Sequence, residues 1–230
     1  MQAAASKRPR VLLADDHPLI LEGLSRLLMN DAEVVGVSTN GREVVSEALR
    51  LRPDAVLLDV SMPLLNGFEA AKQIREQLPA TKLLFVTQKA DRTYVASAFA
   101  LGASAYLIKQ GVAGEVVVAL HEVLAGRYYV SPSLQAHIPD ALKRPNRNPI
   151  DIFGRALTTR QREVLQLVAE GKSIKEAAAI LGVAVKTIDF HKAGIMSTLG
   201  LRTTAELTRY AIEQGIVENQ AEYSRDPDLL

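Results

Sequence analysis

The sequence predicts an α/β protein in which a doubly wound, five-stranded parallel sheet is followed by a second, smaller all-α domain. Three observations along the 230 residues lead to this fold class. Between residues 10 and 126, short apolar runs alternate with helical stretches of about a dozen residues, the pattern of repeated strand–helix units. Residues 134–154 contain three prolines and no sustained period. From residue 155 onward, the apolar pattern is helical throughout.

The five predicted strands are short runs of β-branched and other apolar residues. In chain order, their sequences are VLLAD, EVVGVS, DAVLLD, KLLFVT and SAYLI. The first helical stretch begins near Pro18, because proline suits the first turn of a helix. Its leucines recur at the spacing of one helix face, at Leu21, Leu24, Leu27 and Leu28. Strands that alternate with helices pair in parallel, and the helices cover both faces of the resulting sheet.

Local signals predict four short helices in the second half of the chain. Three capping-box pairs mark helix starts, namely Thr158 with Gln161, Ser173 with Glu176, and Thr203 with Glu206. Three glycines stand where helices should end, namely Gly171, Gly182 and Gly200. The stretch SIKEAAAILGVAVKTIDFHKAGI combines a helix, a glycine turn and a second helix, which is the helix-turn-helix pattern.

We therefore predict one domain at 9–130 and another at 155–217, joined by a linker at 131–154 and followed by an acidic tail at 218–230. Residues 155–217 hold nine Lys and Arg against six Asp and Glu, whereas residues 8–133 hold thirteen against fourteen. The helical half is therefore the basic one, which favours a nucleic-acid partner for that half.

Composition excludes several classes of protein. The chain has no cysteine, which excludes a disulfide scaffold, a Cys-rich zinc site and thiol catalysis. Its longest apolar runs are far shorter than the roughly 20 residues that a membrane helix needs. The opening segment lacks the apolar core of a signal peptide. These features predict a cytoplasmic protein that has no membrane partner.

Five polar side chains stand at the predicted carboxyl ends of strands. They are Asp15 and Asp16 after the first strand, Asp59 after the third, Thr87 at the end of the fourth, and Lys109 after the fifth. Parallel α/β sheets bind ligands at this edge. Clustered carboxylates need a cation to offset their repulsion, and Mg²⁺ prefers such oxygen ligands. Carboxylates, a hydroxyl, an ammonium and Mg²⁺ together suit phosphoryl transfer, with one carboxylate as the nucleophile.

The motifs ADDHPLI, LLDVSMPLLNGFEA, FVTQKAD and GASAYLIKQ resemble the receiver domain of two-component response regulators, which has a flavodoxin-like fold. The resemblance implies that Asp59 is the phosphoacceptor, which takes a phosphoryl group from a histidine kinase. It also implies that Asp16 contacts Mg²⁺ directly, that Asp15 does so through water, and that Ser61 offers its backbone carbonyl. Asp59 completes this metal site.

The same resemblance assigns three further roles in the receiver. Thr87 and Lys109 hold the phosphoryl oxygens, and Tyr106 is the switch aromatic that turns inward when Thr87 moves toward the phosphoryl group. Gln88 departs from the family pattern, which has a small residue there, so access of phosphate or its hydrolysis is expected to be slower. We interpret His17 as a solvent-facing residue at a helix start, because imidazole is a poor ligand for Mg²⁺.

The helical half resembles the LuxR-type DNA-binding domain, and with the receiver it resembles the NarL/FixJ class of response regulators. In the predicted helix 185–199, one face carries the apolar residues Ile188, Ile195 and Leu199. The opposite face would enter the major groove. We predict phosphate contacts for Lys186, Thr187 and Lys192. We predict base contacts for Asp189, Phe190 and Ala193.

This recognition helix departs from its family in two ways. Ala184 stands at the N-cap position, where serine is usual, and the lost cap costs about 1 kcal/mol. Gly194 lies within the helix at a cost of about 1 kcal/mol relative to alanine. We expect a marginal helix that DNA orders.

The combined reading is a DNA-binding response regulator rather than an enzyme, with a sensor histidine kinase and promoter DNA as partners. RNA polymerase is a further candidate partner. We expect a homodimer, with apolar residues of the last helix at its contact: Leu207, Tyr210, Ala211 and Ile216. One alternative is an orphan regulator of the same fold that ignores phosphate. Another is an aspartyl-phosphate phosphatase of the haloacid dehalogenase type, but its nucleophile follows the first strand rather than the third.

Overall fold

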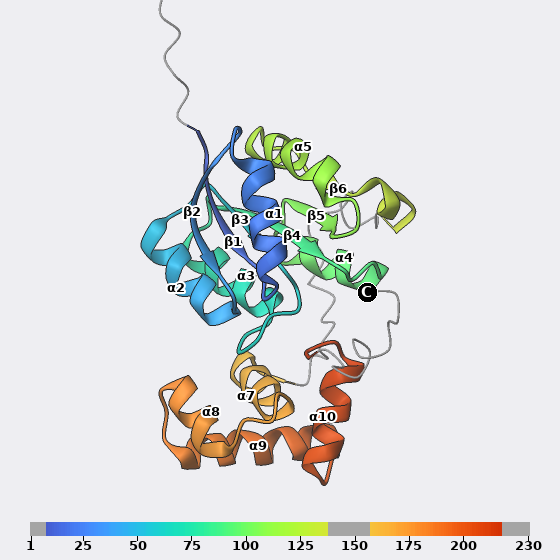
Figure 1. The fold of residues 1–230 in the computed structure, drawn as a ribbon. Helices are drawn as coiled ribbons and strands as arrows, with labels where there is room; N and C mark the ends of the chain where they lie inside the picture. The colour runs from blue at the N-terminus through green and yellow to red at the C-terminus, as the bar shows by residue number, and fades with distance from the viewer. Residues whose placement is uncertain (1–7, 138–156, 218–230) are drawn as a thin grey trace, which may run out of the picture. The chain divides into compact units, whose positions relative to one another are not determined.

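The computed structural model describes residues 8–137 and 157–217 and divides the chain into two compact units, Met1–Ile152 and Phe153–Leu230 (Figure 1). The predicted tail at 218–230 and most of the predicted linker lie outside the described residues, so the proposed domain limits stay predictions. Within the described ranges, no helix is both long enough and apolar enough to cross a bilayer.

The first unit is built on a parallel sheet with the strand order β2-β1-β3-β4-β5-β6. Its strands are β1 (Arg10–Ala14), β2 (Glu33–Ser38), β3 (Ala55–Leu58), β4 (Lys82–Thr87), β5 (Ala105–Ile108) and β6 (Tyr129–Val130). The five strands predicted from the sequence are all present. The prediction of five strands was nevertheless wrong by one, because β6 adds a sixth. This two-residue strand is too short to show a period, and only its pairing with β5 defines it.

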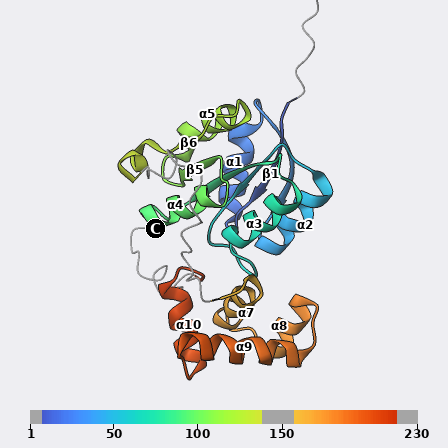
Figure 2. The same ribbon diagram turned by 180° about the vertical axis from the view of Figure 1, so that it is seen from behind.

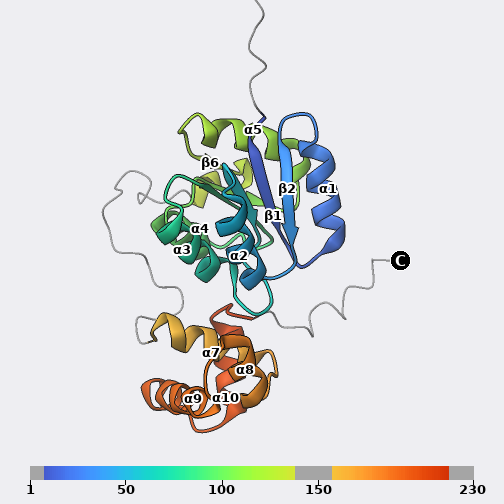
Figure 3. The same cartoon turned by 90° about the vertical axis from the view of Figure 1, so that its left-hand side faces the viewer.

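Helices cover both faces of the sheet, as the alternating pattern predicted (Figures 2 and 3). The helices α1 (Pro18–Leu28) and α5 (Val112–Leu124) pack together on one face, over a core of aliphatic strand residues such as Val11 and Leu57. The helices α2 (Gly41–Leu51), α3 (Gly67–Gln77) and α4 (Arg92–Ala100) lie on the other face. A 3-10 helix, η1 (Pro132–His137), follows β6.

The second unit contains α7 (Thr159–Ala169), α8 (Ile174–Leu181), α9 (Val185–Leu199) and α10 (Thr204–Glu213). All three predicted capping boxes are formed, with both reciprocal hydrogen bonds present at the starts of α7, α8 and α10. The helix α9 begins at the N-cap Ala184 without any side-chain cap, as predicted. Gly182 and Gly200 end α8 and α9 in the left-handed conformation, which glycine adopts without strain.

Two details of this unit differ from the sequence interpretation. The apolar residues Leu207, Ala211 and Ile216 are 1%, 0% and 2% exposed within the single chain. They are buried in the helical unit, where α10 packs against α7, and are not free to make the dimer contact predicted for them. Tyr210 is half-buried, and its part in that contact stays a prediction. The glycine at position 194 is explained by packing, since a Cβ there would lie 3.2 Å from Nε2 of Gln161 on α7, which is a tight contact.

Candidate functional site

The sheet brings the predicted strand-end residues to one edge. The backbone N–H of Asp59 donates to the carbonyl of Ala14 at 2.9 Å, which places Asp59 beside Asp15 at the ends of β3 and β1. The N–H of Lys109 donates to the carbonyl of Thr87 at 2.9 Å, which aligns the ends of β5 and β4 in the same way. Parallel pairing therefore makes one site from residues far apart in the sequence.

Lys109 lies at the centre of this site. Its Nζ is 2.7 Å from Oδ2 of Asp15 and 2.8 Å from Oδ2 of Asp59, and all three side chains are almost fully buried. Burial alone would lower the pKa of Lys109, but the negative charges of Asp59 and Asp15 outweigh it and raise that pKa. The Lys109 ammonium therefore keeps its proton, and it offsets the repulsion between the carboxylates of Asp15 and Asp59.

Asp59 is 3% exposed, and its Oδ1 accepts a hydrogen bond from the N–H of Val60 at 2.7 Å. Burial raises the pKa of Asp59 to about 6 against the opposing charge of Lys109, and the negative charge of Asp15 adds to the rise. A carboxylate that is poorly solvated is a better nucleophile than a hydrated one. Asp59 is therefore the buried carboxylate of the cluster with a raised pKa, and its predicted role as the phosphoacceptor stays a prediction.

The raised pKa of Asp59 predicts that, without divalent cations, the receiver loses free energy of unfolding as the pH rises. In the native state the Asp59 carboxyl keeps its proton up to a pH of about 6, whereas in the unfolded chain its pKa is the ordinary 3.8. The native state therefore binds more protons between these values, so this contribution is complete below pH 3.8 and is lost as the pH rises through about 6. The total loss is about 3 kcal/mol.

Chemical unfolding of the native chain and of Asp59→Asn across this pH range measures the effect. Asparagine does not titrate, so the difference in unfolding free energy between variant and native chain should grow in favour of the variant as the pH rises. A difference that stays constant with pH would contradict the prediction.

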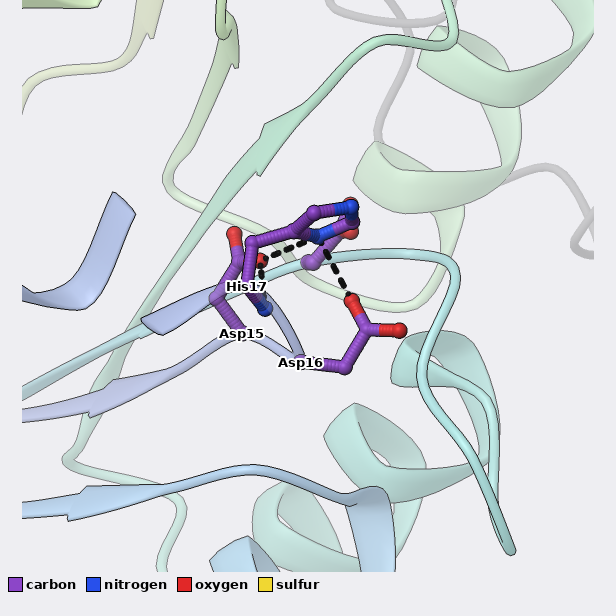
Figure 4. A group of neighbouring side chains, drawn as sticks. Asp15, Asp16 and His17 are labelled. Carbon is purple, nitrogen blue, oxygen red and sulfur yellow. Dashed lines mark hydrogen bonds and ion pairs between the residues drawn. The ribbon is translucent and has the colours of Figure 1, made fainter. Parts of the chain in front are cut away.

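His17 contacts both aspartates that precede it, as Figure 4 shows. Its Nδ1 lies 3.0 Å from Oδ1 of Asp15 and 2.8 Å from Oδ1 of Asp16, and its backbone N–H donates to Oδ1 of Asp15 at 3.0 Å. The side chain is 39% exposed, so it faces solvent as predicted. The sequence interpretation missed its contact with the carboxylates, which its position directly after them could have indicated.

The carboxylate cluster has the chemistry of a cation site. One ligand atom from each of Asp15, Asp16, His17 and Asp59 lies within 4.8 Å of all the others. Oxygen donors dominate the set, and one ammonium is too little charge to balance three carboxylates. The donor set therefore fits a hard divalent ion. The predicted role of the Ser61 carbonyl stays a prediction.

The loop between β3 and α3 supports the site in a way that the sequence analysis did not predict. Asn66 is 2% exposed, and its Oδ1 accepts hydrogen bonds from the N–H groups of Phe68 and Glu69, both at 3.1 Å. The N–H of Gly67 donates to the carbonyl of Val60 at 2.8 Å. The Asn-Gly pair, a common turn signal, was the available clue. These bonds fix the backbone directly after Asp59.

A buried tyrosine connects β5 to the loop after β4. The ring of Tyr106 is fully buried, lies 6.1 Å from the ring of Phe85, and donates its hydroxyl to the carbonyl of Lys89 at 2.7 Å. The N–H of Lys89 in turn donates to Oγ1 of Thr87 at 3.3 Å. Tyr106 therefore points inward and is linked to the hydroxyl beside Asp59 by two hydrogen bonds. The side chain of Gln88 is exposed.

In the helical unit, the predicted DNA-facing residues lie on the outer surface of α9. Phe190 is 75% exposed, although it is aromatic, whereas Ile188 and Ile195 on the other face are 0% and 1% exposed. Lys186, Asp189 and Ala193 are exposed, and Thr187 and Lys192 are half-buried. Nζ of Lys192 bonds to Oγ1 of Thr204 at 2.8 Å. The face predicted from the spacing is therefore a solvent-facing one.

Comparison with known proteins gives matches over both units. Residues 11–121 match the family described as "Response regulator receiver domain", and residues 155–211 match "Bacterial regulatory proteins, luxR family". The transcriptional regulatory protein MctR of Rhizobium johnstonii is 33% identical over 216 residues, which are 92% of this chain and 98% of that protein.

Two solved structures are also similar. A LuxR-family two-component response regulator from Aurantimonas sp. SI85-9A1 matches 61% of this chain and all of its own, with 32% identity and a TM-score of 0.55. The response regulator RcsB, in a complex with DNA, matches 89% of this chain and 98% of its own, with 25% identity and a TM-score of 0.55. The protein thus belongs to the NarL/FixJ class of two-component response regulators, transcription regulators that join a receiver domain to a LuxR-type DNA-binding domain.

Proposed function

We propose that phosphorylation of Asp59 by a histidine kinase turns this protein into a dimeric, sequence-specific regulator of transcription. The contact of Lys109 with both Asp59 and Asp15 carries the proposal, because it places a buried nucleophile, a second carboxylate and a fixed ammonium at one edge of the sheet. This set has the parts that phosphoryl transfer to a carboxylate needs.

In the proposed reaction, a carboxylate oxygen of Asp59 attacks the phosphorus of a phosphohistidine. The new O–P bond forms as the P–N bond to the imidazole breaks, so the products are an aspartyl phosphate and a free histidine. Lys109 and the hydroxyl of Thr87 hold the oxygens of the transferred group. Mg²⁺ held by Asp15, Asp16, Asp59 and the Ser61 carbonyl would offset the negative charge that builds up on those oxygens.

The new charge on Asp59 would then act on Thr87 and Tyr106. The Thr87 hydroxyl moves toward the phosphoryl oxygens, and the inward position of Tyr106 is stabilised by its bond to the carbonyl of Lys89. We propose that this state of the receiver favours association into a dimer. Leu207, Ala211 and Ile216 are buried, so the dimer contact has to use other side chains.

In the helical unit, α9 is the proposed recognition helix. RcsB, which is similar over most of the chain, has been solved in a complex with DNA and as two dimers bound to two DNAs. We propose that this chain likewise binds double-stranded DNA as a dimer, with the exposed face of α9 in the major groove. The exposure of Phe190 supports this, because a large apolar side chain in solvent gains free energy when a partner covers it.

The receiver function is tested by measuring covalent phosphorylation of the chain. The full chain is incubated with acetyl phosphate and Mg²⁺, and its intact mass is measured. A stable gain of one phosphoryl group on Asp59 is expected. An orphan regulator would gain no mass, and a phosphatase would hydrolyse acetyl phosphate continuously without retaining the group, so either result would overturn the proposal.

Lys186 and Phe190 are expected to contribute to DNA binding in different ways. Lys186→Ala should weaken binding to all DNA alike and reduce the salt slope by about one unit, because one phosphate contact is lost. Phe190→Ala should keep the slope and reduce preference for one or two base pairs, at about 1–3 kcal/mol per base contact. Both are titrated against double-stranded DNA selected from a random pool and against its scrambled form, at several salt concentrations.

Lys82→Ala, which removes a lysine from the receiver, is the matched control for a general loss of positive charge. If Phe190→Ala loses equal affinity for the selected and the scrambled DNA, the ring does not read bases.

A further inference from the structure

Ser131 lies where the chain leaves the sheet, in residues 128–137, which we call the exit segment. It directly follows β6 and is 0% exposed, although serine is a polar residue. Its N–H donates to the carbonyl of Tyr106 at 3.0 Å, and its Oγ accepts from the N–H of Ile108 at 3.1 Å. One residue therefore binds β5 through both its backbone and its side chain.

The hydroxyl of Ser131 takes the place that a backbone carbonyl has in a regular ladder. Because β6 has ended, Oγ of Ser131 satisfies the buried N–H of Ile108. The hydroxyl proton is donated to Oε2 of Glu115, in the first turns of α5. The segment is thus bound to β5 and α5 by a single buried hydroxyl.

The residues on either side of this contact belong to the phosphoryl site. Tyr106, whose carbonyl accepts from Ser131, is the inward tyrosine linked to Lys89. Ile108, whose N–H donates to Ser131, directly precedes Lys109, which holds Asp15 and Asp59. A shift of Lys109 or Tyr106 along β5 would therefore reach Ser131 through these two hydrogen bonds.

The part of the exit segment that follows Ser131 packs against the receiver. The N–H of Leu134 donates to the carbonyl of Ser131 at 2.8 Å, which begins η1, and Leu134 is 2% exposed. The helix α4 packs against η1, and the ring of Phe99 on α4 lies 5.9 Å from the ring of Tyr128, just before β6. The first residues after the sheet are therefore part of the receiver fold.

We propose that Ser131 is a positioning residue that passes the state of the phosphoryl site to the linker, by holding the exit segment 128–137 to β5 between Tyr106 and Lys109. This inference rests on the proposed function of Asp59. When a phosphoryl group draws Lys109 toward it, Ile108 moves with Lys109, and the shared hydroxyl moves the start of the linker. Without that hydroxyl, a change at the phosphoryl site would no longer move the exit segment.

Hydrogen exchange on the full chain, with and without Mg²⁺ and beryllofluoride as the phosphoryl mimic, tests the inference. Residues 85–92 report occupancy of the site, and residues 128–137 report the exit segment. In the native chain both should change exchange when beryllofluoride is added. In Ser131→Ala the change at 85–92 should persist, the change at 128–137 should be lost, and the Ile108 amide should exchange about tenfold faster, because its partner is gone.

Two variants separate coupling from loss of structure. Ser133→Ala removes an exposed serine of η1 and should behave as the native chain, and Ser131→Thr keeps the hydroxyl and should restore the response. If Ser131→Ala does not fold, the same exchange measurement at residues 85–92 and 128–137 is made on Glu115→Ala. That variant removes the acceptor that orients the Ser131 hydroxyl, so it should lose the response at 128–137 in the same way. A full response at 128–137 in the variant overturns the inference. A native chain that responds at neither segment overturns the function of Asp59 instead.

Discussion

Asp59→Asn is expected to abolish covalent phosphorylation completely while the receiver stays folded. Only a carboxylate can become an acyl phosphate, and asparagine has nearly the same shape. The variant also removes a buried charge whose pKa is raised to about 6, so its free energy of unfolding at neutral pH should be no lower than that of the native chain. The measurement is intact mass after incubation with acetyl phosphate and Mg²⁺, beside circular dichroism of the same sample.

Asp54→Asn is the matched control for this experiment. Asp54 precedes β3, at the end of the strand opposite Asp59, and its exposed side chain accepts from the N–H of Arg10 at 2.7 Å. This variant should gain the phosphoryl mass as the native chain does. Phosphate that persists on Asp59→Asn and is located on another residue by peptide mass analysis would refute the assignment.

Gly67→Ala is expected to destabilise the receiver by about 3 kcal/mol or more, because overpacking against a fixed backbone cannot relax. A Cβ at Gly67 would lie 1.9 Å from the carbonyl oxygen of Asp59 and 3.0 Å from Cα of Val60. The backbone cannot easily give way, since the N–H of Gly67 donates to the carbonyl of Val60 and Asn66 caps α3. The strain acts on the residue that carries the nucleophile.

Hydrogen exchange of the β3 amides measures the stability of the receiver separately from the helical unit. Phosphorylation of Gly67→Ala should be lost together with this protection. Gly114→Ala is the control, because a Cβ there meets nothing within 4 Å and alanine stabilises an exposed helix position by about 1 kcal/mol. Native protection of β3 in Gly67→Ala would show that the loop can move aside.

The strand-end site could be predicted from the sequence because parallel strands bring their carboxyl ends to one edge, whatever the details of packing. The location of Asp59 and Lys109 at this edge could be predicted from that rule and from the apolar run that precedes each of them. The capping boxes were predictable for a similar reason, since each involves two residues three positions apart.

Three features could not be predicted, because they depend on a tertiary contact, a side-chain rotamer or a backbone angle. Ser131 looks like an ordinary linker serine until β6 places it against β5. The contact of His17 with two carboxylates depends on a side-chain rotamer. Leu64, in the loop after Asp59, has a φ of +65°, a conformation that leucine rarely adopts and no local pattern indicates. The place of Ser131 arises only when distant segments meet, whereas the His17 contact and the Leu64 angle are local features that no apolar pattern records.

The reciprocal caps of α7, α8 and α10 also affect how this protein can evolve. The residues that define where these helices start lie within a few positions of one another, so a gene fusion that joins residues 157–217 to another upstream domain would carry every pair intact. Drift in the receiver or the linker cannot erase those boundaries. The helical unit is therefore suited to be recombined as a module. The start of α9, which has no side-chain cap, depends instead on packing within the unit, where Ile188 in its first turn is fully buried.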